Sequence, residues 1–482
     1  SVEILGSAYE QFLGKQIRIS DAHRVTIEDK PEVRKAGGVY YTPQYIVDYI
    51  VKNTVGKLIE NQPDGKAGKS PKEISKIKIV DPACGSGSFL LGAYQYLLDY
   101  HKDFYSQNGK IKNNIKRSGK NTKEEIVLTP EGNLTTAEKK RILTNNIFGV
   151  DIDTNAVEVT KLSLLLKCME GETDASIATQ TKLWNERVLP NIDNNIKSGN
   201  SLIDTDFYDG ELDFGDEKKI KPFNWQKAFP EVFAQGGFDA VIGNPPYVRI
   251  QSLTETSKES VIYFNNKYET AIYGNYDLYV LFVEKGINLL KENGLLGFIL
   301  PNKFFNTDYG IGLRKLISNK NYLKAIVDFE QNQVFENATT YCCLLFLINL
   351  KNLNFAYLKA IPGTSSINIV KENLIKNDLI GSSPWNFYNN EDKSIIKKLE
   401  NNTSRLINLP CEISRGSSTG NDNIFVFERN KDGELVNGQN EIVSIEEDIL
   451  KIPIYATDFN RYNFKSRFNF RILFPYNIES GK

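Results

Sequence analysis

The sequence contains few of the residues on which most catalytic triads and metal sites are built. Its 482 residues include two His, five Cys and a single Met. Two histidines are too few for a histidine-based triad or a histidine-rich metal centre, so we expect neither. The cysteines form no CxxC pair, which favours a reducing cytosol over a disulfide framework. Chemistry that depends on histidine or on a bound metal is therefore not expected.

Long apolar runs and an excess of charge are missing as well. The longest apolar runs, at 294–301 and 341–350, are far shorter than a membrane span, and the opening residues do not form a secretory signal. We therefore expect a cytoplasmic protein with no membrane partner. The 59 Lys and Arg residues balance 60 Asp and Glu residues, which leaves a net charge of −1. This balance neither implies nor excludes nucleic acid, because a neutral average conceals local patches.

Short apolar stretches alternate with amphipathic helical segments in the first three quarters of the chain. This alternation predicts an α/β fold with a mixed, mostly parallel sheet of seven strands wound on both faces. The strands are expected at 77–80, 147–150, 195–199, 238–242, 295–300, 322–327 and 341–348. The segment 43–60 before them is predicted to be helical, with Thr42 as its N-cap.

Changes in composition divide the chain into four parts. Residues 1–37 are predicted to be a helical connector, and 38–355 the α/β domain. Helical periodicity weakens beyond about 350, so 356–404 is predicted to be a linker. The aromatic and basic sequence of 405–482 favours a β-rich domain. The sequence begins with Ser and its only methionine is Met169, which indicates a piece of a longer protein.

The turn DPACGSG (81–87) follows the first predicted strand and precedes a helix. Gly85 and Gly87 allow a ligand to approach the backbone closely, and the helix offers free N–H groups at its start. A tight turn without a ligand is the alternative. The dinucleotide-binding fingerprint requires a third glycine where this chain has Leu90, which disfavours an NAD-dependent oxidoreductase.

The second predicted strand ends in the acidic sequence FGVDID (148–153). A carboxylate at this place can accept hydrogen bonds from both hydroxyls of a ribose. An acidic residue here can instead cap the helix expected at 154–168. Asp153 is better placed for that cap, which leaves Asp151 for a ligand.

The apolar strand at 238–242 is followed by the sequence NPPY, which comprises Asn244, Pro245, Pro246 and Tyr247. The two prolines supply no N–H donor, so the strand ends here and the turn is stiff. The side-chain oxygen of Asn244 can accept a hydrogen bond from an amine, and the ring of Tyr247 offers a face on which a base can stack. This combination suits an exocyclic amine on a planar ring.

These motifs resemble, in their order, those of the gamma class of DNA N6-adenine methyltransferases. The arrangement is similar to the methyltransferase region of type IIG restriction–modification enzymes. The resemblance implies a Rossmann-like fold that uses S-adenosylmethionine, and a target-recognition domain that begins near residue 405. The matching segments are GGVYYTPQYIVDYIV (37–51), DPACGSGSF (81–89), GVDID (149–153), GNSLID (199–204), NPPY (244–247), 276–305 and 327–347.

The resemblance implies a binding site for S-adenosylmethionine. Asp151 would hold the ribose hydroxyls, and Ile152 would pack on the adenine of the cofactor. Asn200 stands where many relatives carry Asp for the adenine amine, so this chain departs from the pattern there. The implied cofactor-binding residues are Tyr41, Thr42, Asp81, Pro82, Ala83, Gly85, Gly87, Phe89, Asp151, Ile152, Asn200 and Ser201.

The resemblance also implies a target, an adenine flipped out of double-stranded DNA. The side-chain oxygen of Asn244 and the carbonyl of Pro245 would accept hydrogen bonds from N6, in a turn that Pro246 stiffens. Tyr247 would stack on the base and Phe335 would close the other face, although a core position is the alternative for Phe335. Such chemistry depends on orientation and polarisation rather than on a general base, which agrees with the scarcity of histidine.

Further expectations concern DNA and the rest of the enzyme. Arg249, Lys303 and Arg415 are candidates for phosphate contacts, although such cations are more often solvated surface charges. A nuclease domain is expected upstream and is missing from this chain, and the recognition domain is expected to be truncated. The segment LDFGDEKK (212–219) has the letters of a nuclease motif but lies in a polar stretch, so no cleavage centre is assigned.

Two other functions remain open from the sequence. NPPY can hold any planar amide or amine, so the substrate can be a protein glutamine or an RNA adenine. The long extension 351–482 favours DNA over these. The chain can also be a non-catalytic DNA-binding subunit of a phage-defence system, but intact Asn244, Tyr247 and Asp151 favour catalysis.

Overall fold

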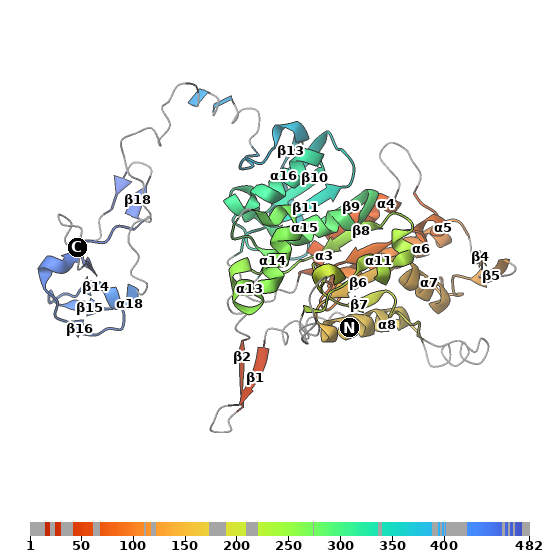
Figure 1. Cartoon of the computed structure of the whole chain (residues 1–482), viewed down its shortest axis with the longest axis horizontal. Coiled ribbons are helices and arrows are strands. Elements are labelled where there is room, and N and C mark those ends of the chain that lie inside the picture. The colour runs from red at the N-terminus through yellow and green to blue at the C-terminus, as the bar shows by residue number, and fades with distance from the viewer. Residues whose placement is uncertain are drawn as a thin grey trace. The chain divides into compact units, whose positions relative to one another are not determined.

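The chain divides into two compact units, Ser1–Asn390 and Glu391–Lys482 (Figure 1). Within the residues that the structure describes, no helix is long and apolar enough to cross a membrane. The computed structural model describes residues 15–19, 25–29, 42–60, 68–109, 112–116, 122–172, 189–208, 220–272, 274–335, 340–387, 394–395, 398–399, 401, 422–455, 458–460, 463–465 and 468–474.

A nine-stranded sheet forms the centre of the first unit, counted over the described ranges. The strand order is β13-β12-β10-β11-β9-β8-β3-β6-β7. The strands are β3 (Ile79–Asp81), β6 (Ile147–Asp151), β7 (Ile196–Ser198), β8 (Phe238–Gly243), β9 (Leu290–Pro301), β10 (Leu323–Asp328), β11 (Cys342–Ile348), β12 (Asn354–Pro362) and β13 (Ile367–Lys376). Neighbours from β9 to β7 pair in parallel, as do β10 and β12, whereas β11 is antiparallel to β9 and β10. The predicted α/β class, with a mixed and mostly parallel sheet, is confirmed.

Two hydrophobic cores lie on the two faces of this sheet. Successive residues of β8 show the alternation, because Ala240 and Ile242 belong to one core and Val241 to the other. The first core is covered by α3 (Gln44–Val51), η1 (Lys52–Gly56), α6 (Ser88–Gln107), α7 (Thr136–Asn146) and α8 (Thr154–Met169). The second is covered mainly by α14 (Lys258–Lys267), α15 (Leu278–Leu289) and α16 (Ile311–Lys320). The sheet is therefore wound on both faces, as the sequence predicted.

Shorter elements connect these layers. Those before β8 are α4 (Lys57–Ile59), α5 (Pro71–Ile74), the antiparallel pair β4 (Lys112–Lys116) and β5 (Thr122–Ile126), η2 (Thr205–Tyr208), α11 (Trp225–Ala228) and α12 (Pro230–Phe233). Those after it are α13 (Ile250–Thr256), η3 (Glu269–Ile272), η4 (Asn302–Phe305), η5 (Asp308–Gly310) and η6 (Asn377–Leu379).

Two of the predicted boundaries are corrected by the structure. The stretch 356–404 was expected to be a linker, yet β12 and β13 extend the sheet through it and the first unit continues to Asn390. The stretch 1–37 was expected to be a helical connector, yet β1 (Lys15–Ile19) and β2 (Val25–Asp29) form an antiparallel pair. β-branched residues at alternate positions, including the paired Ile17 and Ile27, favour this strand pairing. The helix expected before Lys15 lies outside the described residues.

The second unit is β-rich, as expected. Its sheet has the antiparallel order β16-β15-β14-β20-β17, and its core is small, with Phe427, Leu435 and Leu450 as the buried members. The elements are α18 (Asp422–Phe425), β14 (Val426–Arg429), β15 (Leu435–Asn437), β16 (Ile442–Val443), η8 (Glu447–Ile449), β17 (Leu450–Lys451), β18 (Phe459–Asn460), β19 (Asn463–Phe464) and β20 (Phe470–Leu473).

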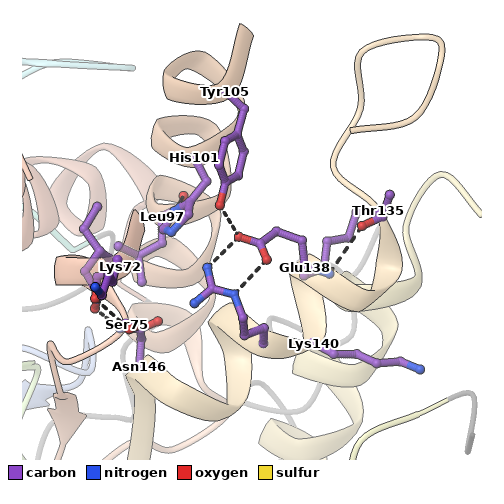
Figure 2. A network of polar contacts seen from close by, with 12 residues as sticks. Lys72, Ser75, Leu97, His101, Tyr105, Thr135, Glu138, Lys140 and Asn146 are labelled. Carbon is purple, nitrogen blue, oxygen red and sulfur yellow. Dashed lines mark hydrogen bonds and ion pairs between the residues drawn. The ribbon is translucent and has the colours of Figure 1, made fainter. Parts of the chain in front are cut away.

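An ion pair between Glu138 and Arg141 lies within α7, and the Tyr105 hydroxyl connects it to α6 (Figure 2). The Glu138 carboxylate accepts hydrogen bonds from the Tyr105 hydroxyl at 2.7 Å and from Nε of Arg141 at 2.7 Å. Burial alone would raise the pKa of Glu138, but these donors outweigh it and the pKa is lowered. His101 is buried beside them, with Nδ1 2.7 Å from the Leu97 carbonyl oxygen, and burial lowers its pKa to about 4. This histidine is therefore a neutral core residue.

Candidate functional site

Three sequence motifs meet at the carboxyl edge of the sheet. The glycine-rich turn follows β3, Asp151 ends β6, and Asn244 follows β8. The strands β8, β3 and β6 are adjacent and parallel, so their carboxyl ends lie side by side. In open α/β sheets, this edge is where ligands bind. The fold therefore brings together the three motifs that the sequence analysis singled out.

The glycine-rich turn has a conformation that glycine adopts most easily. Gly85 and Gly87 have φ of 53° and 88°, in the left-handed region. A Cβ on Gly87 would lie only 2.9 Å from Cγ2 of Thr160. The Thr160 hydroxyl donates to the Gly85 carbonyl at 2.7 Å, which fastens the turn to α8. Thr160 was missed in the sequence, because it lies in the middle of an ordinary helix with no motif around it.

The start of α6 leaves backbone donors at this turn. The helix begins at Ser88 with Gly87 as its N-cap, and no side chain caps it. The first N–H groups of a helix have no intrahelical acceptor and attract anionic groups. The following side chain, Phe89, is 3% exposed and packs into the first core, so it supports the turn from within.

Asp81 and its neighbours also build the turn from inside. The Asp81 carboxylate is buried and accepts a hydrogen bond from the Ala83 N–H at 2.9 Å. It lies close to the end of β8, because a Cβ on Gly243 would be 2.7 Å from its Oδ1. Ser201 donates to the Pro82 carbonyl at 2.5 Å, which ties the turn after β7 to this one. The structure thus uses Asp81 and Ser201 to hold the backbone.

Asp151 is hydrogen-bonded both to the glycine-rich turn and to the residues that follow β6. Its Oδ2 accepts from the Gly85 N–H and its Oδ1 from the Asp153 N–H, each at 2.8 Å. Burial raises its pKa, although these two bonds act in the opposite direction. Each carboxylate oxygen can accept a second hydrogen bond, which leaves capacity for hydroxyl groups. Asp153 caps α8 by accepting from the Asn155 N–H, as predicted.

Two further residues from the predicted cofactor set follow the adjacent strands β6 and β7. Ile152 follows Asp151 and its apolar side chain is 48% exposed, so a flat ligand can cover it. Asn200 follows β7 and its side-chain oxygen accepts from the Leu202 N–H at 3.1 Å. The amide oxygen of Asn200 is therefore already engaged in a local turn.

Asn244 carries the unusual feature of the site. Its Nδ2 donates to the Thr42 hydroxyl at 3.1 Å, whereas its Oδ1 is buried and has no hydrogen-bond partner among the described residues. A buried acceptor without a donor costs roughly 1–3 kcal/mol, so such groups are few in folded proteins. Pro245 beside it is buried and Pro246 is exposed. The amide oxygen is thus held in place and ready to accept.

Thr42 differs from its predicted place. It was expected to cap the helix after it, but Pro43 is the N-cap of α3 and no side chain caps this helix. Thr42 is instead 4% exposed and its hydroxyl accepts from Asn244. The difference arises because Asn244 lies beside it in space, which a local pattern cannot reveal. Tyr41, also predicted to line the cofactor site, lies outside the described residues.

Tyr247 and Phe335 contribute the aromatic surfaces. The Tyr247 hydroxyl donates to the Ile299 carbonyl at 3.2 Å, and its ring meets the Tyr279 ring edge-on with centroids 6.2 Å apart. Phe335 is 3% exposed and belongs to the core cluster against which Tyr247 packs. The structure thus joins both aromatic residues to one cluster and also gives Phe335 the core position that was its alternative.

Two of the three residues predicted to contact DNA phosphates lie within the described part of the chain. Arg249 and Lys303 are exposed, and both act on Asp277, whose pKa burial raises and these two cations lower. Two cations therefore stand close to the residues that follow NPPY. Arg415 and the segment 212–219 lie outside the described residues. In the part of the chain that the structure covers, no group of three or more His, Cys, Asp or Glu is placed to hold a metal ion.

The chain is similar to several known proteins. The chain is 37% identical over 358 residues to the type II restriction enzyme and methyltransferase RM.Eco57I of Escherichia coli, covering 74% of this chain and 32% of that protein. It is 29% identical over 256 residues to the type II methyltransferase M.BstVI of Geobacillus stearothermophilus, covering 48% and 42%. The solved structure of the type IIL restriction–modification enzyme MmeI with DNA is similar with a TM-score of 0.45 and 15% identity, covering 72% and 41%. The chain therefore spans less than half the length of these proteins.

The family match includes many residues of the candidate site. Residues 145–335 match the profile of the Eco57I restriction-modification methylase family. This range contains Asp151, Asn200, the NPPY sequence and Phe335. Over residues 145–335, the chain is therefore similar to the Eco57I restriction-modification methylase family.

Proposed function

We propose that this chain transfers a methyl group from S-adenosylmethionine to N6 of an adenine in double-stranded DNA, as part of a restriction–modification enzyme. The observation that supports it most is the buried Oδ1 of Asn244 at the carboxyl edge of the sheet, which has no hydrogen-bond partner among the described residues. The similarity to a methylase family supports the reaction class, and this oxygen offers the acceptor that an exocyclic amine needs.

The residues around the glycine turn fit S-adenosylmethionine. When bound, this cofactor supplies an electrophilic methyl group on a sulfonium. The two left-handed glycines leave room for close approach, and the uncapped start of α6 suits an anionic group. Asp151 retains lone pairs for ribose hydroxyls, and the exposed side of Ile152 offers an apolar surface for the adenine ring. The buried Ser201 hydroxyl, already engaged, is not part of this proposed contact set.

The protein's part in the reaction is to orient and polarise the target amine. The Oδ1 of Asn244 and the Pro245 carbonyl accept from N6, which localises the nitrogen lone pair and stabilises the positive charge that develops on it. Tyr247 stacks on the ring, with its own hydroxyl fixed on Ile299. A general base is not needed to start the transfer, because N6 is deprotonated only after it has gained the methyl group and its proton then passes to water. The buried His101, neutral near pH 7, plays no part. The base reaches this pocket by leaving the duplex.

The experiment compares Asn244→Ala with the wild-type chain. Methyl transfer to duplex DNA is followed with tritium-labelled S-adenosylmethionine, and cofactor binding is measured separately by titration calorimetry. Loss of one preorganised group that stabilises charge lowers kcat by about 10²–10³. We expect this loss with cofactor affinity unchanged within about threefold. Asn306→Ala, at an exposed asparagine outside the contact set, serves as the matched control. Undiminished transfer by Asn244→Ala would refute the proposal.

The β-rich unit Glu391–Lys482 is proposed to begin the target-recognition domain. Its described strands carry exposed or half-exposed cations, among them Arg429, Lys451 and Arg471. Such side chains can contact DNA phosphates. Reversing the charges of Lys451 and Arg471 should weaken DNA binding and reduce its salt dependence, while methyl-donor affinity stays the same.

A further inference from the structure

The segment 329–335 leaves β10 and ends at Phe335. It is built on the carboxylate of Asp328, the last residue of β10, which is 6% exposed. The Oδ1 of Asp328 accepts from the Glu330 N–H at 2.9 Å and from Nδ2 of Asn302 at 3.1 Å, and Oδ2 accepts from the Tyr357 hydroxyl at 2.8 Å. One buried carboxylate therefore connects the segment to η4 and to β12.

The donors around this carboxylate are neutral in the described part of the chain. A buried carboxylate is costly unless its oxygens are hydrogen-bonded, and three donors on two oxygens meet that need. The pKa of Tyr357 is raised by burial and by Asp328, so its hydroxyl stays protonated and donates. The nearest lysine on β12, Lys359, pairs with Glu330. The Asp328 charge is thus used to fix geometry.

The turn that follows is strained and held at several points. Glu330 has a φ of 51°, in the left-handed region that residues with a Cβ rarely adopt. Its N–H is bound by Asp328, its carbonyl accepts from Asn302 at 3.4 Å, and its carboxylate pairs with Lys359 at 2.5 Å. Asn332 then donates to the Phe329 carbonyl through both its backbone N–H and its side chain. Strain of this kind persists only where neighbours impose it, and it is typical of functional segments.

The end of β9 contacts both Tyr247 and the start of the segment that ends at Phe335. Ile299 on β9 accepts the Tyr247 hydroxyl, and Asn302, directly after β9, binds the Asp328 carboxylate and the Glu330 carbonyl. Val334, next to Phe335, is buried in the same cluster. A planar base fits between two rings only when their separation is fixed. The contacts at the end of β9 thus tie Tyr247 and the start of segment 329–335 to the same strand end.

We propose that Asp328, held by Tyr357 and Asn302, is a positioning residue that fixes segment 329–335 and so places Phe335 as the second wall of the target-base pocket. This inference rests on the proposed function, because it takes that pocket as the site of the flipped adenine. It also gives the strand β12 a role in the reaction. Tyr357 reaches Asp328 only because β12 lies beside β10 in the sheet.

The test removes one hydroxyl. Tyr357→Phe deletes the bond to Asp328 but keeps the ring, which stacks on Phe387 with centroids 4.2 Å apart. We expect kcat/KM for duplex DNA to fall about tenfold, which is the loss of one hydrogen bond to a charged group. Cofactor affinity stays within about twofold of the wild type. Tyr94→Phe, which deletes a buried hydroxyl bonded to the Lys139 carbonyl on α7, is the matched control and retains activity.

Two readouts distinguish positioning from a general structural effect. A mismatched target adenine leaves the duplex more easily, so the deficit of Tyr357→Phe should shrink to below about threefold on such DNA. In a Phe335→Leu background, Tyr357→Phe should add less than about twofold, because both changes act on the same wall. Full tenfold losses in both settings, or wild-type activity of Tyr357→Phe, would overturn the inference.

These outcomes are separable from those of the proposed function. If Asn244→Ala is inactive and Tyr357→Phe behaves like Tyr94→Phe, the function stands and the positioning inference falls. If Asn244→Ala transfers methyl groups normally, the proposed function falls whatever Tyr357→Phe does. Thermal unfolding of each variant is measured alongside, so that an unfolded variant is recognised. The positioning inference is then judged on the folded Tyr357→Phe variant, which lacks only one hydroxyl.

Discussion

The substitution Gly87→Ala tests the glycine turn on which the cofactor site is built. Gly87 has a φ of 88°, and a Cβ there would lie 2.9 Å from Cγ2 and 3.0 Å from Oγ1 of Thr160. The added methyl group therefore strains the backbone and also pushes against the side chain that donates to the Gly85 carbonyl. Both effects act on the turn, because Thr160 fastens it to α8.

The expected loss in the free energy of unfolding is the sum of these two effects. A left-handed conformation costs an L-residue about 1–2 kcal/mol, and loss of the Thr160–Gly85 hydrogen bond costs about 1 kcal/mol. The free energy of unfolding should therefore fall by about 2–3 kcal/mol. Gly132 provides the control, because its φ is 80° and a Cβ there would meet nothing within 4 Å. Gly132→Ala should show the conformational part alone.

The measurement is urea unfolding, with titration calorimetry of S-adenosylmethionine on the folded variants. Gly87→Ala should be less stable than Gly132→Ala by about 1 kcal/mol and should bind the cofactor at least tenfold more weakly, while Gly132→Ala binds normally. Thr160→Ser in the Gly87→Ala background removes the Cγ2 methyl group of Thr160. This second change should recover part of the stability that Gly87→Ala loses. Equal stability and equal affinity of the two alanine variants would refute the packing argument.

Three further outcomes are expected. Thr42→Val removes the hydroxyl that accepts from Asn244, so kcat should fall at least threefold while Thr42→Ser keeps the wild-type rate; equal rates for both variants would count against the Thr42–Asn244 contact. Asp151→Ala should weaken cofactor binding at least tenfold in calorimetry, because the ribose acceptor and the bond to the turn are both lost, and unchanged binding would remove Asp151 from the site. His101 has a folded pKa of about 4 against an ordinary 6.5, so the unfolded chain binds the proton more readily and stability declines as pH falls from about 6.5 to 4. His101→Phe should flatten that decline by about 3 kcal/mol in urea unfolding at several pH values, and an unaltered slope would contradict the burial of a neutral imidazole.

The sequence predicted the parts of the fold that local patterns encode. Seven of the nine strands lie where they were predicted, and most of them are short apolar runs separated by helices. The edge strand β13 was missed because most of its residues are exposed and its sequence shows no clear alternation. The strand β12 was missed with it, and both fell in the predicted linker.

The site shows the same division between local and long-range information. Gly87, Asp153 and NPPY were recognisable because spacing and residue type carry the signal. The bond between Thr42 and Asn244 joins residues 202 positions apart, and the bond between Asp328 and Tyr357 crosses from β10 to β12. Such contacts depend on how the layers pack. A single sequence contains no periodic or local pattern that reveals them.

The product of the reaction is the most direct test of the central claim. Duplex DNA that contains many different sequences is incubated with the protein and S-adenosylmethionine. The DNA is then digested to nucleosides and analysed by mass spectrometry. We expect N6-methyladenine from the wild-type chain and from Asn306→Ala, and none from Asn244→Ala. Methylcytosine as the product, or N6-methyladenine formed equally by Asn244→Ala, would contradict the role given to the unpartnered oxygen of Asn244.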